Sequence, residues 1–92
     1  MAHIVTVRII AADEWEYPDA HGFWDPSKNE ILLVRQKHSL LLHTFWHEVT
    51  HAILDMMSHK LSRNEQFVDQ FGGLLAQLAK SAKNAAAKNT DG

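Results

Sequence analysis

The order of hydrophobic and polar positions predicts a β-rich first part followed by two helices. Residues 4–10 are β-branched almost throughout and predict a strand. Two further strands are predicted at about 22–25 and 30–34, joined as a hairpin by the turn Pro26–Asn29. Polar residues 11–21 separate this hairpin from the first strand. We therefore expect a small, three-stranded, mostly antiparallel sheet.

The apolar spacing becomes helical after this sheet. One helix is predicted over about residues 40–59, which carries the active-site candidates, and a second over about residues 62–82. The apolar residues of the first helix that fall on one broad face are Leu42, Phe45, Trp46, Val49, Ile53, Met56 and Met57. The expected buried stripe of the second helix consists of Phe67, Val68, Phe71, Leu74, Leu75 and Leu78.

The length of 92 residues predicts one domain of the α+β class. Residues 1–82 hold all the predicted elements and form this single minimal domain. Residues 83–92 have lost the apolar stripe, and we expect a frayed or disordered tail there. A chain of this length can form only a small hydrophobic core, so a bound metal could contribute to folding as well as to chemistry.

The amino-acid composition limits the possible partners and metal ligands. The net charge is −2 with histidine neutral, which favours neither a nucleic-acid nor a membrane partner. Seven histidines and no cysteine mean that a metal site must be built from imidazoles and carboxylates. Neither a signal peptide nor a membrane-spanning helix can be placed, so we expect a cytoplasmic protein, either a monomer or a small homo-oligomer.

One motif stands out inside the first predicted helix. His47, Glu48 and His51 form the pattern H-E-x-x-H. Residues i and i+4 lie about 40° apart on a helix, so both imidazoles can face one zinc ion. Glu48 lies at the edge of that face, where it can act as the general base on a water molecule whose pKa zinc lowers toward ~7. The competing interpretation is a histidine-rich helix face without a metal.

Two histidines leave a zinc site incomplete. One way to complete it uses a third histidine six residues after His51, but that position is Met57. The other way uses a carboxylate from the next helix, where Glu65 and Asp69 lie one turn apart above Gly72-Gly73. We predict Glu65 as the third ligand and Asp69 as an acceptor for the far N–H of His47. Glu65 could instead belong to a capping box with Ser62, and Asp69 could be a solvated acid.

These residues resemble the gluzincin metallopeptidases, and in particular the single-domain minigluzincins. In that family H-E-x-x-H is completed by a Glu on the following helix, with an Asp four residues later, which matches Glu65 and Asp69. The stretch Thr44–His51, preceded by Ile31–Val34, is also similar to small intracellular peptidases of phages and mobile elements. Some relatives of those peptidases cleave repressor proteins. The resemblance covers about residues 22–78.

The chain departs from the family pattern downstream of the ligand glutamate. Larger gluzincins carry a His, Tyr or Arg there to stabilise the oxyanion, whereas this chain has none after Phe71. The group must then come from upstream, and the candidates are Tyr17, His21, His43, Arg35 and His38. The family also binds extended substrates along an edge strand, for which the strand Glu30–Val34 is a candidate.

The resemblance implies a zinc-dependent peptidase that acts on a peptide or protein substrate. A regulatory protease that cleaves the repressor of a phage or mobile element is a narrower form of this hypothesis. Two alternatives remain open: a non-catalytic zinc-binding module, and a hydrolase acting on a non-peptide amide. A deformylase-type site is excluded because it needs a cysteine ligand.

Overall fold

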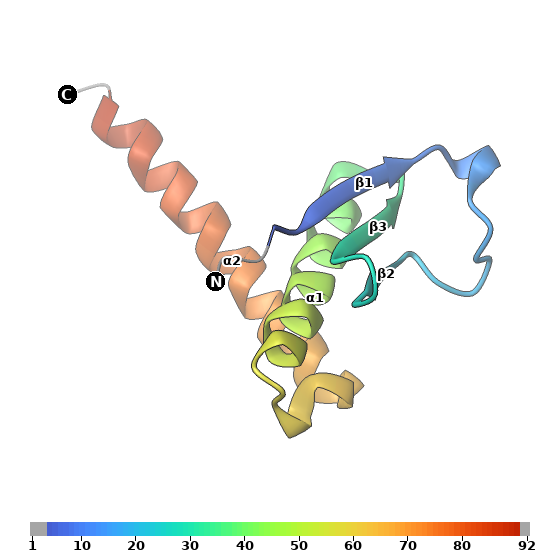
Figure 1. Ribbon diagram of the computed structural model, residues 1–92. Helices are drawn as coiled ribbons and strands as arrows, with labels where there is room; N and C mark the ends of the chain where they lie inside the picture. The colour runs from blue at the N-terminus through green and yellow to red at the C-terminus, as the bar shows by residue number, and fades with distance from the viewer. Residues whose placement is uncertain (1–3, 91–92) are drawn as a thin grey trace.

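The protein is an α+β domain of three strands and two long helices, as the pattern predicts (Figure 1). The computed structural model describes the backbone of residues 4–90 and the side chains of residues 4–82. The elements in chain order are β1 (Thr6–Ile10), the 3-10 turn η1 (Ala12–Glu14), β2 (Gly22–Asp25), β3 (Glu30–Val34), α1 (His38–Met56), the 3-10 turn η2 (Lys60–Arg63) and α2 (Glu65–Thr90).

The sheet has the strand order β1-β3-β2 and is mixed rather than mostly antiparallel. β2 and β3 pair antiparallel as the predicted hairpin, whereas β1 pairs parallel with β3. Asp25 shapes the hairpin turn by accepting hydrogen bonds from the main-chain N–H and the hydroxyl of Ser27. The hairpin places β2 along one edge of β3, and β1 pairs with β3 along the other edge. β3 is therefore the central strand, and the prediction that it forms an open edge for substrate is wrong.

The core lies between β3 and α1. Ile31 and Leu33 point from β3 toward α1, where they cluster with Ala52, and each is at most 2% exposed. Glu48 and Thr50 are also buried in α1, although both are polar. The buried positions of α1 therefore include polar residues as well as apolar ones.

The predicted buried stripe of α2 is buried only in part. Val68 is fully buried, but Phe71, Leu74 and Leu78 are exposed by 45%, 59% and 66%. The side of α2 that meets α1 is set by the close contact at Gly72, and these three side chains lie elsewhere on the helix. The periodicity identified the apolar face of α2 correctly but could not say whether another element covers it.

The helix ends differ from the predicted ones for local reasons. α2 begins at Glu65 rather than near residue 62, because the side chain of Asn64 accepts a hydrogen bond from the N–H of Phe67 and caps the helix. The backbone stays helical through Thr90, which includes most of the predicted frayed or disordered tail 83–92. Residues 1–3 of the predicted domain and residues 91–92 of that tail lie outside the described residues.

In the described part of the chain, no helix combines the length and hydrophobicity needed to cross a bilayer.

Candidate metal centre

The two helices approach most closely where Gly72 of α2 meets the backbone of His47 in α1. A Cβ atom added at Gly72 would lie 2.9 Å from the Cα of His47 and 3.1 Å from the carbonyl oxygen of Trp46. Real Cβ atoms do not approach backbone so closely, so only glycine fits at this position. Gly73 is different, because its added Cβ would meet only the His43 ring at 3.8 Å. The close approach at Gly72 brings Glu65, two turns earlier in α2, over the histidines of α1.

We expect alanine substitutions at these two neighbouring glycines to have opposite effects on stability. Gly73→Ala should raise the free energy of unfolding by about 0.5–1 kcal/mol, because alanine is the better helix former. Gly72→Ala should lower it by about 1–2 kcal/mol, since overpacking strain of about 1–3 kcal/mol outweighs the same gain. Thermal unfolding of both variants measures the difference. Equal stabilisation by both substitutions would contradict the close contact.

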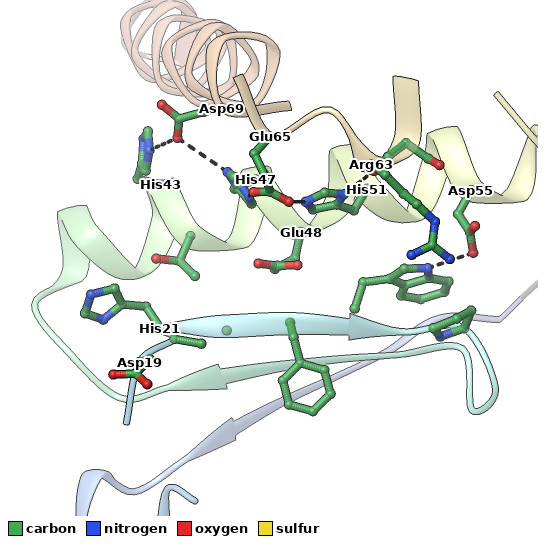
Figure 2. A pocket seen from close by; sticks show the side chains of 17 residues that line it. Asp19, His21, His43, His47, Glu48, His51, Asp55, Arg63, Glu65 and Asp69 are labelled. Carbon is green, nitrogen blue, oxygen red and sulfur yellow. Dashed lines mark hydrogen bonds and ion pairs between the residues drawn. The ribbon is translucent and has the colours of Figure 1, made fainter. Parts of the chain in front are cut away.

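The structure brings His47, His51 and Glu65 together as one potential metal site (Figure 2). The Glu65 carboxylate spans both rings: Oε2 lies 3.1 Å from Nε2 of His47, and Oε1 lies 2.8 Å from Nε2 of His51. One ligand atom from each residue fits within 4.8 Å of the other two. Two imidazole nitrogens and a carboxylate oxygen are a donor set that zinc takes in catalytic sites, so these residues fit a metal ion.

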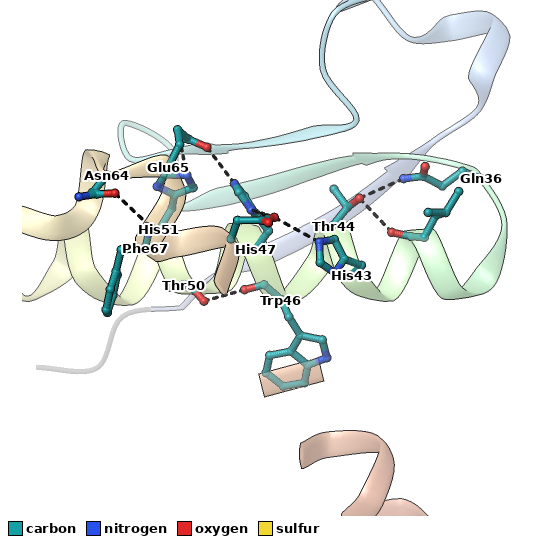
Figure 3. Close-up of polar contacts among 12 residues, drawn as sticks. Gln36, His43, Thr44, Trp46, His47, Thr50, His51, Asn64, Glu65 and Phe67 are labelled. Carbon is teal, nitrogen blue, oxygen red and sulfur yellow. Dashed lines mark hydrogen bonds and ion pairs between the residues drawn. The ribbon is translucent and has the colours of Figure 1, made fainter. Parts of the chain in front are cut away.

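Figure 3 shows His43, His47 and His51 along α1, with Glu65 beside His47 and His51. Other groups contact these two histidine rings through Nδ1. Nδ1 of His51 is hydrogen-bonded to the carbonyl oxygen of Ser62. A carbonyl oxygen can only accept, so Nδ1 carries the proton and Nε2 keeps its lone pair for a metal. Nδ1 of His47 lies 3.4 Å from Oδ1 of Asp69, which also contacts Nε2 of His43 at 3.3 Å. Both rings therefore present Nε2 toward Glu65.

Glu48 lies beside this cluster but is not part of it. Its carboxyl group points from α1 toward β2, below the two histidines, and the residue is only 7% exposed (Figure 2). Burial raises the pKa of Glu48, while the neighbouring His47 and His51 and the main-chain N–H of Trp24 act in the opposite direction. A carboxyl group with a raised pKa next to a metal site is a candidate general base.

A cleft of about 740 Å³ opens over these groups, between β2 on one side and α1 and η2 on the other. Gly22 lets β2 lie this close, because an added Cβ would be 2.9 Å from the Thr44 methyl group of α1. Since β2 pairs only with β3, its other edge is open in the described part of the chain. His21 and His43 line one end of the cleft, and Trp24 lines the other.

The upstream candidates for stabilising an oxyanion are placed differently. His21 and His43 line the cleft, whereas Tyr17, Arg35 and His38 do not. Tyr17 packs edge-on against Trp15 and Phe23, with ring centroids 5.3 and 4.7 Å away. The indole N–H of Trp15 donates to the carbonyl oxygens of Tyr17 and Ala20 and folds the loop into this arrangement.

Sequence reasoning missed the far end of the cleft. There the indole N–H of Trp24 donates to Oδ2 of Asp55 at 3.1 Å, and Arg63 of η2 lies nearby (Figure 2). One signal was available, because Asp55 follows His51 by four residues and so continues the His47/His51 face of α1. No comparable signal exists for Ser62, whose contribution is a main-chain carbonyl.

Comparison with known proteins adds no assignment to this geometry. No protein-family model, no curated protein and no solved structure matches the chain. The chemistry of the site therefore has to be inferred from its own residues: three potential metal ligands, a buried carboxyl group beside them, and an open cleft along a strand edge.

Proposed function

We propose that this chain is a zinc-dependent peptidase of the gluzincin type, in which His47, His51 and Glu65 hold the metal. Zinc held by these side chains would polarise a peptide carbonyl and make a water molecule more acidic. Glu48 would accept a proton from that water on its carboxylate and later deliver it to the departing amine. His21 and His43, at one end of the cleft, are the candidates for stabilising negative charge on the carbonyl oxygen.

The position of Glu48 is the observation that carries this proposal. Burying a carboxylate that is only 7% exposed costs free energy unless the group is protonated or paired with a positive charge or hydrogen-bond donors. Glu48 lies directly below the two histidines, yet the group of potential ligands is completed by Glu65 and not by Glu48. A carboxylate adjacent to a metal, but not bound to it, suits proton transfer rather than metal binding.

The open edge of β2 supports a peptide as the substrate. Gly22, Phe23 and Trp24 of β2 line the cleft together with Glu48, so β2 borders the candidate site. An extended peptide could add to the edge through main-chain hydrogen bonds and would then pass over the metal site. β2 thus takes the substrate-binding role that the sequence suggested for β3.

The arrangement favours this proposal over a non-catalytic zinc module. A structural site would need a fourth protein ligand, for which Asp69 and His43 are the nearest candidates. Asp69 lies against Nδ1 of His47, on the side of the ring away from Glu65, and His43 contacts Asp69. Among the described residues, neither belongs to the His47, His51 and Glu65 group, which supports a site that would leave one position to water or substrate.

Hydrolysis of a diverse peptide mixture tests the proposal. The purified protein, the same protein treated with a chelator, and the treated protein with zinc restored would each be incubated with the mixture. Mass spectrometry of the products should show new cleavage sites in the first and third samples and none in the second. Absence of cleavage by fully zinc-loaded protein, or identical products after metal removal, would count against a zinc peptidase.

A further inference from the structure

The outer face of α2 carries an apolar stripe that is largely exposed in the described part of the chain. We define the α2 stripe as Phe67, Phe71, Leu74 and Leu78. Their spacing of four, three and four residues is the heptad spacing of helices that pair with other helices. Exposure increases along the stripe from 45% at Phe71 to 66% at Leu78. The stripe thus has the pattern of a helix–helix seam without its second helix.

The α2 stripe lies on a different side of α2 from Glu65 and Asp69. At about 100° per residue, Leu74 lies roughly 160° around the helix from Gly72, which contacts α1, and Leu78 lies roughly 120° from it. Glu65 and Asp69 contact the α1 histidines and so lie on the α1 side. Figure 1 shows the later turns of α2 extending past α1 and the sheet, with no other element beside them. A partner on the stripe would therefore leave the cleft open.

The surroundings of the α2 stripe are uncharged. Between residues 66 and 79 the only charged side chain is Asp69, and it faces His43 and His47. The stripe is bordered by Gln70 and Gln77. Interface cores are depleted of charge in this way. A surface with no charge of either sign can pair with an identical copy of itself without repulsion.

The exposed area around the α2 stripe is comparable to the area that one copy contributes to a stable dimer interface. Glu65 contacts His51 and Asp69 contacts His43, so α1 runs opposite to α2. The end of α1, which carries Ile53 and Met57, exposed by 44% and 66%, therefore lies near the start of α2. Together with the stripe and its glutamine border, they offer on the order of 800 Å² per copy, which is the contribution of one partner to a standard interface.

We propose that the α2 stripe is the interface of a homodimer, in which the α2 helices of two copies pair antiparallel about a two-fold axis near Leu74. A two-fold interface uses the same patch on both copies, which the uncharged stripe permits. The pairing buries Phe71, Leu74 and Leu78 and holds α2 in place, and α2 in turn positions Glu65. Each dimer carries two clefts that open away from the interface.

The mass of the protein in solution tests this proposal. Light scattering across the micromolar range should give twice the chain mass of 10.5 kDa. Replacing Leu74 and Leu78 by Gln together should weaken dimerisation at least about a hundredfold, since central interface anchors dominate binding. Circular dichroism and thermal unfolding would establish that this double variant is folded. Ile9→Gln, on the open edge of β1 and also an exposed apolar residue at 44%, is the control and should leave the dimer intact.

A cross-linking experiment locates the axis independently. The chain has no cysteine, so Leu74→Cys introduces a single thiol per copy. Mild oxidation should join two copies of this variant through a disulfide, whereas Ile9→Cys should remain uncross-linked. A monomer at every concentration would overturn the proposal. So would a dimer that survives the double substitution, or one that is lost in the Ile9→Gln control.

Discussion

Glu65→Ala should abolish tight zinc binding while the wild-type protein binds about one zinc per chain. Glu65 is the residue whose carboxylate spans the Nε2 atoms of both His47 and His51. Residues that merely orient a metal ligand contribute about 10–100-fold to affinity, so removing a direct ligand should weaken binding by more than about a hundredfold. Elemental analysis of the purified protein and competition with a chromogenic zinc chelator measure stoichiometry and affinity.

Two further variants test whether the loss of zinc binding is specific to Glu65. Glu16→Ala removes an exposed carboxylate that neither lines the cleft nor belongs to the potential metal site, and should leave zinc binding unchanged. Asp69→Asn should give an intermediate loss of about 10–100-fold, because it weakens the acceptor beside Nδ1 of His47 without removing a ligand. Thermal unfolding provides a second readout, since zinc raises the stability of any variant that binds it only when folded. Stoichiometric, tight zinc in Glu65→Ala would exclude Glu65 as the third ligand.

Much of the site was predictable because it depends on local geometry. The i, i+4 spacing alone places His47 and His51 on one face of a helix. A glycine such as Gly72, which has no side chain, permits a close approach of α2 to another backbone, and in the structure Gly72 meets the His47 backbone. Helical spacing from Glu65 to Gly72 then fixes which side chains face the histidines. The α+β class was predictable for the same reason, since each element has its own period.

The parts that were not predictable depend on tertiary choices. The parallel pairing of β1 with β3 depends on how the connection 11–21 crosses the molecule, and that segment has no periodic pattern. The true cap of α2, Asn64, lies two residues after Ser62, which is an equally acceptable cap by residue type. The Ser62 carbonyl that holds His51 belongs to the main chain, and so leaves no trace in residue identity.

The exposed α2 stripe is a further case in which the sequence pattern does not determine a tertiary contact. Periodicity indicates that Phe71, Leu74 and Leu78 share a face, and a shared apolar face predicts burial. It does not indicate whether the covering surface comes from the same chain or from another copy. The predicted burial and the observed exposure agree if a second copy supplies the cover, as in the proposed homodimer.

Glu48→Gln should reduce peptide hydrolysis by about 10²–10⁴-fold, the usual contribution of a general base, and leave zinc content unchanged. Glutamine keeps the size of the side chain but cannot accept the proton. Because Glu48 is not among the potential ligands, the metal should remain bound. Turnover of a peptide identified in the cleavage screen, with zinc measured on the same samples, gives both quantities. Glu16→Gln, in an exposed loop position, is the control and should retain full turnover.

The stability of metal-free Glu48→Gln should be equal to or higher than that of the metal-free wild type at neutral pH. Burial raises the pKa of Glu48 above its ordinary value of 4.5, so the folded state disfavours the ionised carboxylate more than the unfolded chain does. The wild type therefore loses stability as the pH rises from 4.5 through the raised pKa, and the variant, which has no charge there, does not. Thermal unfolding of both proteins between acid and neutral pH measures this difference. A variant that lost turnover together with stability would point to a structural role for Glu48, whereas lost turnover with full zinc and undiminished stability assigns it to proton transfer.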